Sequence, residues 1–328
     1  MLTIRPGRVT AVLERHEGLV RIEVDGTPCV AYPGQTGPVA LGDEVLVNTQ
    51  ARELELGSGG YDVLYANLTR GLGGSPTRGA HVMKLPYTPL QHAVVHAEER
   101  AVLAEGLARM PVVCCSLHSQ VVPVCAGLGE GHRVAYVQLP GGALPVSLSD
   151  AVRALRARGL VQTAIAVGAC VDGDVQCVTA ASALLWAAAR HYDTVVCAIG
   201  PGIVGTGTSF GHGGLSAAEA ANAATALRGS PVIAVRASLA DERERHRTAS
   251  HHTRAVLELC LGKVSLAWPR GWDAPEWLEP RVVEVDVAGW ERVCAGLPLS
   301  HMGRGPQDDP LFFAASFAAG RLAHRRAA

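Results

Sequence analysis

The feature that most constrains the fold is a series of short, wholly apolar segments in the second part of the chain. Stretches with helical character separate most of these segments. Apolar runs of this length without polar alternation are typical of strands that are buried on both faces. Because a helix follows most of them, we expect parallel neighbours in one sheet that helices cover on both faces. The predicted strands are residues 111–117, 133–139, 163–169, 194–199, 231–235, 264–268 and 282–287.

The helices between these strands are predicted from residues that start helices. Ser149 and Ser250 stand where a side-chain oxygen can accept from the first free backbone N–H groups. Ser216 and Glu219 have the spacing of a capping box. Pro89 stands near the start of another helical stretch, where proline is tolerated. The predicted helices are residues 89–110, 149–158, 178–190, 216–227, 251–261 and 311–324.

The first 65 or so residues have a different pattern, in which short strands are separated by turn residues. Asp25-Gly26, Pro33-Gly34 and Gly42-Asp43 mark the turns, and no helical period intervenes. This pattern predicts a small antiparallel β-barrel-like domain. We therefore expect an all-β domain over residues 1–68, a glycine-rich linker over 69–89 and an α/β domain over 90–328.

Composition restricts the class of protein. Apolar residues make up 48% of the chain and charged residues 18%, which suits a packed core. The net charge of −1 argues against a nucleic-acid binder, which normally carries a basic face. No apolar run is long enough to span a membrane, and the start of the chain does not resemble a signal peptide. The nine cysteines include no CxxC pair, so we expect buried free thiols and a cytoplasmic location.

Sites in parallel sheets lie beyond the carboxyl ends of the strands, and the densest glycine segment follows one of them. Residues 199–214, here called the glycine loop, read IGPGIVGTGTSFGHGG. Backbone N–H groups of such a loop can approach an anion or a carbonyl group. The spacing matches neither a Walker loop nor a dinucleotide loop, and a tight structural turn is the alternative. The predicted ligand-binding residues here are Gly202, Gly205, Thr206, Gly207 and Thr208.

A second segment rich in histidine and arginine follows the strand that ends at Val235. A helix capped by Ser250 would place two adjacent histidines at its positive end, which keeps imidazole neutral. A neutral imidazole can bind a metal, act as a general base or simply pack as a polar group, and we keep all three alternatives. Adjacent histidines can share a metal only if the helix has barely begun. The candidates are Asp241, Arg245, His246, Arg247, His251 and His252.

Other polar residues also stand where strands end. His118 and Gln120 follow the strand at 111–117, where a ring can enter a site or be satisfied locally. Asp172 and Asp174 flank Gly173, which indicates an Asp-Gly turn or, near the histidines, acid–base chemistry. No Gly-x-Ser-x-Gly elbow is present, which argues against a serine hydrolase of that type.

Five segments occur in an order that resembles a bacterial family catalogued as domain of unknown function 3866. They are HVMKLPYTPLQ, SLHSQ, LPVSLSD, IGPGIVGTGT and RHRTASHHT. The family has no established activity, so the resemblance implies motif positions rather than chemistry. Relatives carry a Gly-His-Ala-Phe-Gly-Gly-like segment with a Glu where this chain has GACVDGDVQC. The implied positions are Lys84, His118, Gln120, Gly202, Gly205, Thr206, Gly207, Thr208, Asp241, Arg245, His246, His251 and His252.

These observations predict one cleft at the carboxyl edge of the sheet that takes a small anionic or carbonyl-bearing ligand. His246 or His251 would act as acid or base, and Arg245 and Arg247 would hold charge. A hydrolase- or transferase-like enzyme is the first hypothesis. A non-catalytic ligand-binding or regulatory protein, with the β domain for interactions, is the alternative. The sequence specifies no cofactor or metal, and a homodimer is the base-rate expectation.

Overall fold

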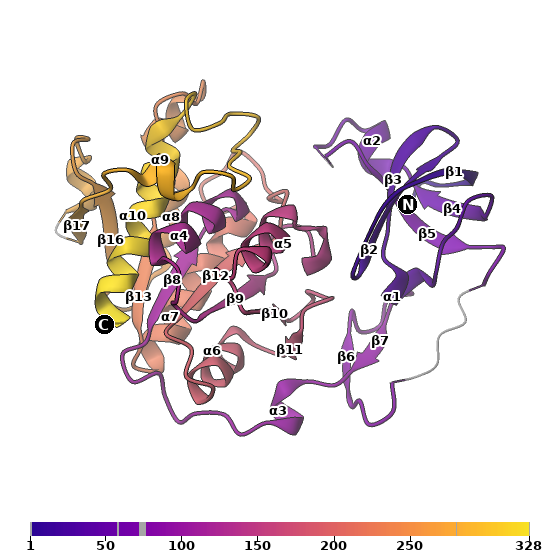
Figure 1. Cartoon of the computed structure of the whole chain (residues 1–328), viewed down its shortest axis with the longest axis horizontal. Coiled ribbons are helices and arrows are strands. Elements are labelled where there is room, and N and C mark those ends of the chain that lie inside the picture. Colours follow the sequence, from indigo (N-terminus) through magenta and orange to yellow (C-terminus); the bar gives the residue numbers. More distant parts are fainter. Residues whose placement is uncertain (1, 58, 72–76, 280, 328) are drawn as a thin grey trace. The chain divides into compact units, whose positions relative to one another are not determined.

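The computed structural model describes residues 2–57, 59–71, 77–279 and 281–327, which form two compact units. The first unit spans residues 1–94 and the second spans residues 95–328 (Figure 1). Each unit has its own hydrophobic core.

The first unit contains a closed five-stranded barrel, as predicted, with strand order β1-β2-β3-β5-β4. All neighbours are antiparallel except β3 and β5, which are parallel. Apolar side chains such as Val9, Ile22 and Leu64 fill its interior. A separate β6–β7 hairpin follows. The elements are β1 (Ile4–His16), β2 (Leu19–Val24), β3 (Thr27–Ala31), α1 (Pro33–Thr36), β4 (Glu44–Asn48), α2 (Gln50–Glu53), β5 (Asp62–Asn67), β6 (Val82–Lys84) and β7 (His92–Val94).

The second unit is built on an eight-stranded sheet in the order β11-β10-β9-β12-β8-β13-β16-β17, in which every neighbouring pair is parallel. This confirms the predicted α/β class. A two-stranded ribbon, β14–β15, stands apart from the sheet. The strands are β8 (Pro111–Cys115), β9 (Val134–Leu139), β10 (Thr163–Val167), β11 (Val175–Cys177), β12 (Thr194–Ile199), β13 (Ser230–Ala234), β14 (Ala237–Ser238), β15 (Thr248–Ala249), β16 (Ser265–Pro269) and β17 (Val282–Val285).

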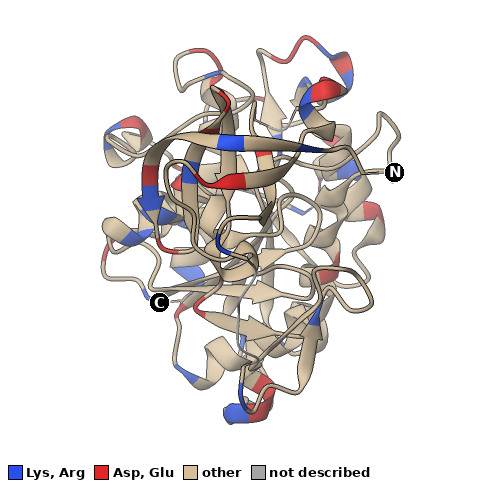
Figure 2. Ribbon diagram, turned by 90° about the vertical axis from the view of Figure 1, so that its right-hand side faces the viewer, with Lys and Arg blue, Asp and Glu red and all other residues tan. Residues whose placement is uncertain are grey.

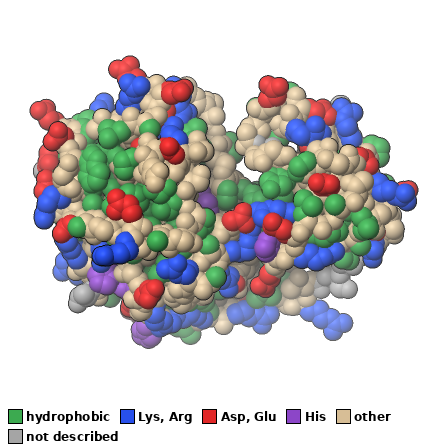
Figure 3. Space-filling view, turned by 45° about the horizontal axis from the view of Figure 1, so that its top comes forward, with side chains coloured by type: hydrophobic (Ala, Val, Ile, Leu, Met, Phe, Trp, Pro, Cys, Tyr) green, Lys and Arg blue, Asp and Glu red, His purple; other side chains and the backbone are tan. Residues whose placement is uncertain are grey.

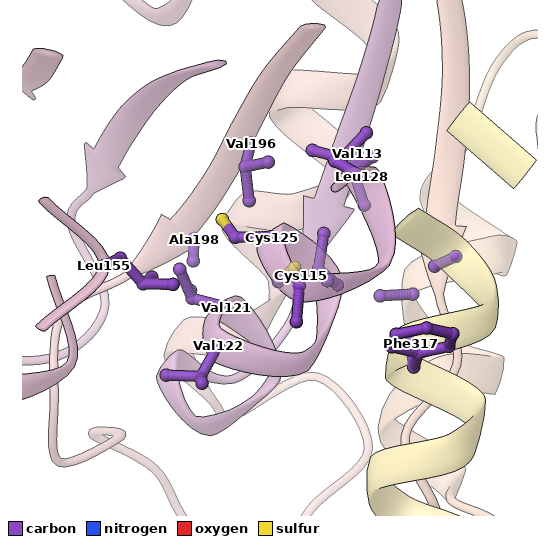
Figure 4. Packing of buried hydrophobic residues seen from close by; sticks show 14 of the residues in the cluster. Val113, Cys115, Val121, Val122, Cys125, Leu128, Leu155, Val196, Ala198 and Phe317 are labelled. Carbon is purple, nitrogen blue, oxygen red and sulfur yellow. The ribbon is translucent and has the colours of Figure 1, made fainter. Parts of the chain in front are cut away.

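Alternation of side chains along each strand gives the sheet two apolar faces, and each face has its own core. Val113 and Cys115 pack on one face with α4, α5, α9 and α10, and Figure 4 shows Phe317 of α10 in this core. Val112 and Cys114 pack on the other face with α6, α7 and α8. The helices are α3 (Ala97–Arg100), α4 (Val121–Leu128), α5 (Asp150–Ala157), α6 (Ala180–Ala189), α7 (Ser216–Ala226), α8 (His251–Leu259), α9 (Trp290–Val293) and α10 (Pro310–Ala327).

The helix predicted over residues 89–110 is wrong. The segment contains the strand β7, the single turn α3 and then irregular chain. Its backbone bonds to other elements instead of to itself: the N–H groups of Ala104 and Leu107 donate to the carbonyls of Leu185 and Leu227. These tertiary hydrogen bonds outweigh the helix propensity of a stretch rich in Ala, Glu and Leu.

The predicted helix starts are correct in two cases and wrong in a third. Ser149 accepts from the N–H of Val152, and Ser250 accepts from the N–H of His252, so both cap their helices. Ser216 does not form the predicted capping box, because its hydroxyl donates to the carbonyl oxygen of Pro140 at 2.7 Å. A 3-10 turn leads directly into α7, so this helix starts without a side-chain cap.

All nine cysteines are free thiols, and all but Cys260 are buried, as predicted. Basic and acidic residues are interspersed along the chain (Figure 2), and both signs mix on the visible faces of the two units (Figure 3). Among the described residues, no helix combines the length and the apolar character that crossing a membrane requires.

Candidate functional site

The histidine-rich segment leaves the carboxyl end of β13 and returns to the sheet through α8. The β14–β15 ribbon pairs Ala237 with Ala249 and Ser238 with Thr248, which closes residues 239–247 into a loop. The side chains that gather there, together with two that other segments contribute, are here called the histidine–arginine cluster. Its members are His212, Arg236, Asp241, Arg243, Arg245, His246, His251, His252 and Arg304.

Three imidazoles form the centre of the cluster. One ring nitrogen from each of His246, His251 and His252 lies within 4.8 Å of the other two. The hydroxyl oxygen of Ser250 accepts from the backbone N–H of His252 at 3.1 Å and lies 2.7 Å from Nδ1 of His246. The residue that caps α8 therefore also holds His246 against the start of the helix. His251 and His252 are the first two residues of α8, where the helix has only begun.

The backbone of this segment is strained next to the rings. Thr248 has a φ of +55°, a left-handed conformation that β-branched residues rarely adopt. Pairing with Ser238 in the ribbon holds it there. Strained residues of this kind persist where the surroundings enforce them, and they occur frequently at functional sites. The strain is an indication of function that does not depend on the histidines.

The glycine loop contributes a fourth imidazole. The ring of His212 stacks on that of His252, with centroids 3.7 Å apart and planes at 15°. Gly205 pairs with His212 across the loop, and a Cβ at Gly205 would lie only 2.8 Å from the Cβ of His212. A Cβ at Gly207 would lie 3.9 Å from Nη2 of Arg245. The glycine loop and the histidine segment therefore meet, as the sequence predicts.

Guanidinium groups surround the imidazoles. Arg236 is buried, and its Nη1 donates to Nδ1 of His252 at 2.8 Å. The carboxylate of Asp241 lies 2.9 Å from Arg243, 3.5 Å from Arg304 and 3.6 Å from Arg236. One carboxylate is thus shared among three cations. Arg245 makes no ion pair with any residue that the structure describes.

Burial and positive charge keep the imidazoles neutral. Burial, followed by the charges of Arg236 and Arg243, lowers the pKa of His246 to about 3. Burial and the charge of Arg236 lower the pKa of His252 to about 2, and burial and the charge of Arg245 lower that of His251. Near neutral pH the rings are therefore uncharged, and each can donate one N–H.

Asp241 stays ionised. Burial opposes its charge, but hydrogen bonds from the Arg243 side chain and backbone hold the pKa of this carboxyl far below its usual range. A carboxylate that is so strongly paired cannot exchange a proton near neutral pH. Asp241 therefore organises the arginines and takes no part in proton transfer.

The spacing of the three imidazoles would allow a metal ion, but the surrounding groups favour an anion. Because Arg236 donates to Nδ1 of His252, the proton of the neutral ring is on Nε2, which then offers no lone pair to a metal. The guanidinium groups also repel a dication. Asp241, the nearest carboxylate, is bound to arginine. Guanidinium and imidazole N–H groups are donors of the kind that bind oxyanions.

His118 and Gln120 lie beyond β8, and the protein satisfies their polar groups. Nδ1 of His118 lies 3.0 Å from the carbonyl oxygen of Ile199, and Nε2 lies 2.7 Å from the hydroxyl of Ser149. Burial lowers the pKa of His118 to about 4. The amide of Gln120 accepts from the N–H of Leu117 and donates to the carbonyl of Ala234. Both side chains hold the start of the glycine loop and the ends of strands in place.

The remaining predicted residues have varied positions. Thr206 and Thr208 are exposed, with their hydroxyls 2.8 Å apart, and Gly202 is in the same loop. Arg247 is exposed and donates to the backbone of Asp241. Lys84 is buried in β6 of the first unit. Asp172 bonds Ser147, and Asp174 bonds Arg156, which fits the turn interpretation of that segment.

The sequence did not indicate the two cluster members that other segments contribute, His212 and Arg304, or the neighbouring His301. His212 lies within the glycine loop. Its position shortly before a predicted helix is the sequence signal that could have indicated a site residue. Arg304 lies in the loop before α10 and pairs with both Asp241 and Asp309. His301 in the same loop stacks on Phe312 with centroids 3.8 Å apart, and its Nδ1 lies 3.1 Å from the hydroxyl of Ser119.

Comparison with known proteins gives one match. The model of a family described as "Protein of unknown function (DUF3866)" matches residues 28–320. No curated protein and no solved structure matches the chain. The match spans parts of both units, including all residues of the histidine–arginine cluster.

Proposed function

The chain belongs to the DUF3866 family, and we propose that it binds a small anionic ligand at the histidine–arginine cluster and transforms it by acid–base catalysis. The reaction class is hydrolysis or group transfer. The observation that carries the proposal is the placement of neutral imidazoles among guanidinium groups that outnumber the nearby buried carboxylates. Arginine binds oxyanions through fixed pairs of N–H donors, and neutral imidazole is the usual general base.

Arg245 is the group that would hold the ligand. It is exposed, it makes no ion pair with the described residues, and it lies beside Gly207 of the glycine loop. The hydroxyls of Thr206 and Thr208 stand in the same loop and add neutral hydrogen-bonding groups. The other arginines are tied to Asp241, so they supply positive potential more than direct contacts.

His251 is the group that would move the proton. Its ring is partly exposed, and its Nε2 is buried without a hydrogen-bond partner among the residues that the structure describes. An unsatisfied buried polar atom costs about 1–3 kcal/mol, so its retention favours a role in binding or catalysis. His246 and His252 each have a ring nitrogen engaged, with Ser250 and Arg236 respectively. His251 therefore accepts the proton of the attacking water or hydroxyl in this proposal.

A panel of phosphoester, thioester and amide substrates tests the proposal. We expect turnover of at least one anionic substrate by the wild type, and a loss of about 10²- to 10⁴-fold in kcat in His251→Ala. His191→Asn is the control, because His191 is exposed between α6 and β12, at the amino edge of the sheet. Thermal shifts with the same compounds report binding. Binding without turnover would instead indicate a ligand-binding or regulatory protein. The absence of both binding and turnover would refute the proposal.

A further inference from the structure

A second group of cations lies at the opposite edge of the sheet. β8, β13 and β16 are parallel neighbours, and their amino ends lie side by side. A cavity of about 660 Å³ opens there, lined in part by Arg109, Ser230, Lys263, Ser265 and Arg326. The histidine–arginine cluster follows the carboxyl end of β13, so the strand separates the two places.

Arg326 forms one wall of this cavity. It stands in the last turn of α10, and its Nη1 and Nη2 donate to the hydroxyls of Ser230 and Ser265 at 3.3 and 2.8 Å. The two serines begin β13 and β16, so the guanidinium bridges two neighbouring strands. Partial burial lowers the pKa of Arg326. The side chain is fixed in place rather than free in solvent.

Arg109 stands on a strained segment at the same cavity. Ala108 and Arg109 have φ angles of +46° and +68°, two successive left-handed residues that are not glycine. The N–H of Arg109 donates to the carbonyl of Arg228 at 2.9 Å, which holds this conformation. Residues in this conformation persist only where the surrounding structure holds them. This conformation places Arg109 at the cavity. Arg326, which is distant in the sequence, lines the same cavity.

The described lining of the cavity contains cations and no acidic side chain. The cations are Arg109, Lys263 and Arg326. Lys263 is one of only two lysines in the chain. None of the three cations pairs with a carboxylate among the residues that the structure describes. Clustered cations that lack counterions favour a multiply charged anion, which contacts several of them at once.

We propose that this cavity is a second binding site, specific for a small phosphorylated metabolite with at least two anionic groups. Its volume lies within the range of small-molecule sites. The lining contains no aromatic ring on which a nucleobase could stack, so a sugar phosphate or a pyrophosphate group fits better than a nucleotide. A local cavity rather than an extended basic stripe also favours a small molecule over nucleic acid.

Isothermal titration of the full chain with pyrophosphate at low ionic strength tests this site. We expect the double variant Arg109→Gln/Lys263→Gln to bind at least 10-fold more weakly at this site. Both side chains are exposed, so the variant should fold, which circular dichroism checks. Arg325→Gln is the matched control, since it removes a neighbouring exposed charge of α10 that does not line the cavity. Arg245→Gln should weaken only the binding of pyrophosphate at the histidine–arginine cluster, so it shows which binding event belongs to that site.

The outcomes separate the two sites. The cavity is supported as an independent site if the double variant Arg109→Gln/Lys263→Gln loses one binding event and Arg245→Gln keeps that event. An unchanged isotherm in the double variant would overturn the proposal. Equal weakening by Arg325→Gln, or sulfate binding as tight as that of pyrophosphate, would also overturn it, because diffuse charge would then explain the binding. None of these results depends on turnover at the cluster.

Discussion

The ends of two neighbouring strands, β8 and β13, show what distinguishes a candidate site from ordinary polar packing. At least one histidine follows each strand. Near each strand end, the hydroxyl of a helix-capping serine lies within hydrogen-bond distance of one imidazole: Ser149 contacts His118, and Ser250 contacts His246. Beyond β8 the protein satisfies both nitrogens of the ring. Beyond β13 one nitrogen of His251 has no partner in the described part of the chain, and guanidinium groups surround the rings.

The comparison teaches that a histidine at the end of a parallel strand is weak evidence on its own. What distinguishes the second place is unused hydrogen-bonding capacity combined with unbalanced charge. The two strand ends should therefore respond differently to substitution. Changes beyond β8 should affect stability alone, whereas changes beyond β13 should affect ligand binding or turnover.

The largest effect on stability is expected from Asp241→Ala. This carboxylate is shared by Arg236, Arg243 and Arg304, and its removal leaves buried positive charge without a partner. We expect a loss of about 3–4 kcal/mol in the free energy of unfolding, measured in urea. Glu242→Ala is the control, because this neighbour is exposed, and its effect should stay below about 0.5 kcal/mol. Similar values for the two variants would contradict the role of Asp241 as the organising anion.

His118→Ala should destabilise by about 2–3 kcal/mol, because it leaves the carbonyl of Ile199 and the hydroxyl of Ser149 without their partner. His251→Ala should cost at most about 1 kcal/mol, because Nε2 of that ring has no partner to lose. The five tryptophans all lie in the second unit, so their fluorescence reports its unfolding. The reverse order of stability loss would break the comparison between the two strand ends.

The stability of the second unit should fall as pH decreases. The pKa values of His246 and His252 are about 3 and 2 in the folded state, below the value of about 6.5 expected in an unfolded chain. Their contribution is complete above pH 6.5 and is lost as pH falls toward the folded values. Each ring should contribute a slope of up to about 1.4 kcal/mol per pH unit between pH 6 and 4. Urea unfolding of the wild type and of His252→Gln at several pH values measures the slope of the free energy of unfolding against pH. The same slope in both proteins would contradict the low pKa of His252.

Modest effects are expected from the two caps. Ser250→Ala and Ser149→Ala should each cost about 1–2 kcal/mol of stability, because each removes one capping acceptor and one hydrogen bond to an imidazole. Only Ser250→Ala should also weaken the binding of phosphate, since it releases His246 in the cluster. Thermal shifts with phosphate distinguish the two, and equal binding in both variants would show that Ser250 does not position the site.

Much of the fold could be predicted from the sequence because buried parallel strands are apolar throughout. The helix α4 could not be predicted, because all eight of its residues are buried and none marks a polar face. The helix predicted over residues 89–110 is wrong because hydrogen-bond partners of this segment, such as Leu185 and Leu227, are distant in sequence.

The candidate site was predictable where its residues are close in sequence. His246, His251 and His252 share one loop and one helix start, and Ser250 predicts both the cap and the neutral rings. His212 and Arg304 could not be assigned, because only tertiary packing decides which loops fold onto this segment. His118 was placed correctly at a strand end, but sequence does not reveal that Ile199 and Ser149 satisfy its ring.

The central claim is that the cluster takes an anion directly and not through a metal. Calorimetric titration of chelator-treated protein with inorganic phosphate tests this most directly, with Arg245→Gln as the variant and Arg325→Gln as the control. We predict that binding survives chelation and weakens about 10- to 100-fold in Arg245→Gln, the cost of one charge-assisted hydrogen bond. Binding that disappears on chelation and returns with zinc, or that Arg245→Gln leaves unchanged, would contradict the account.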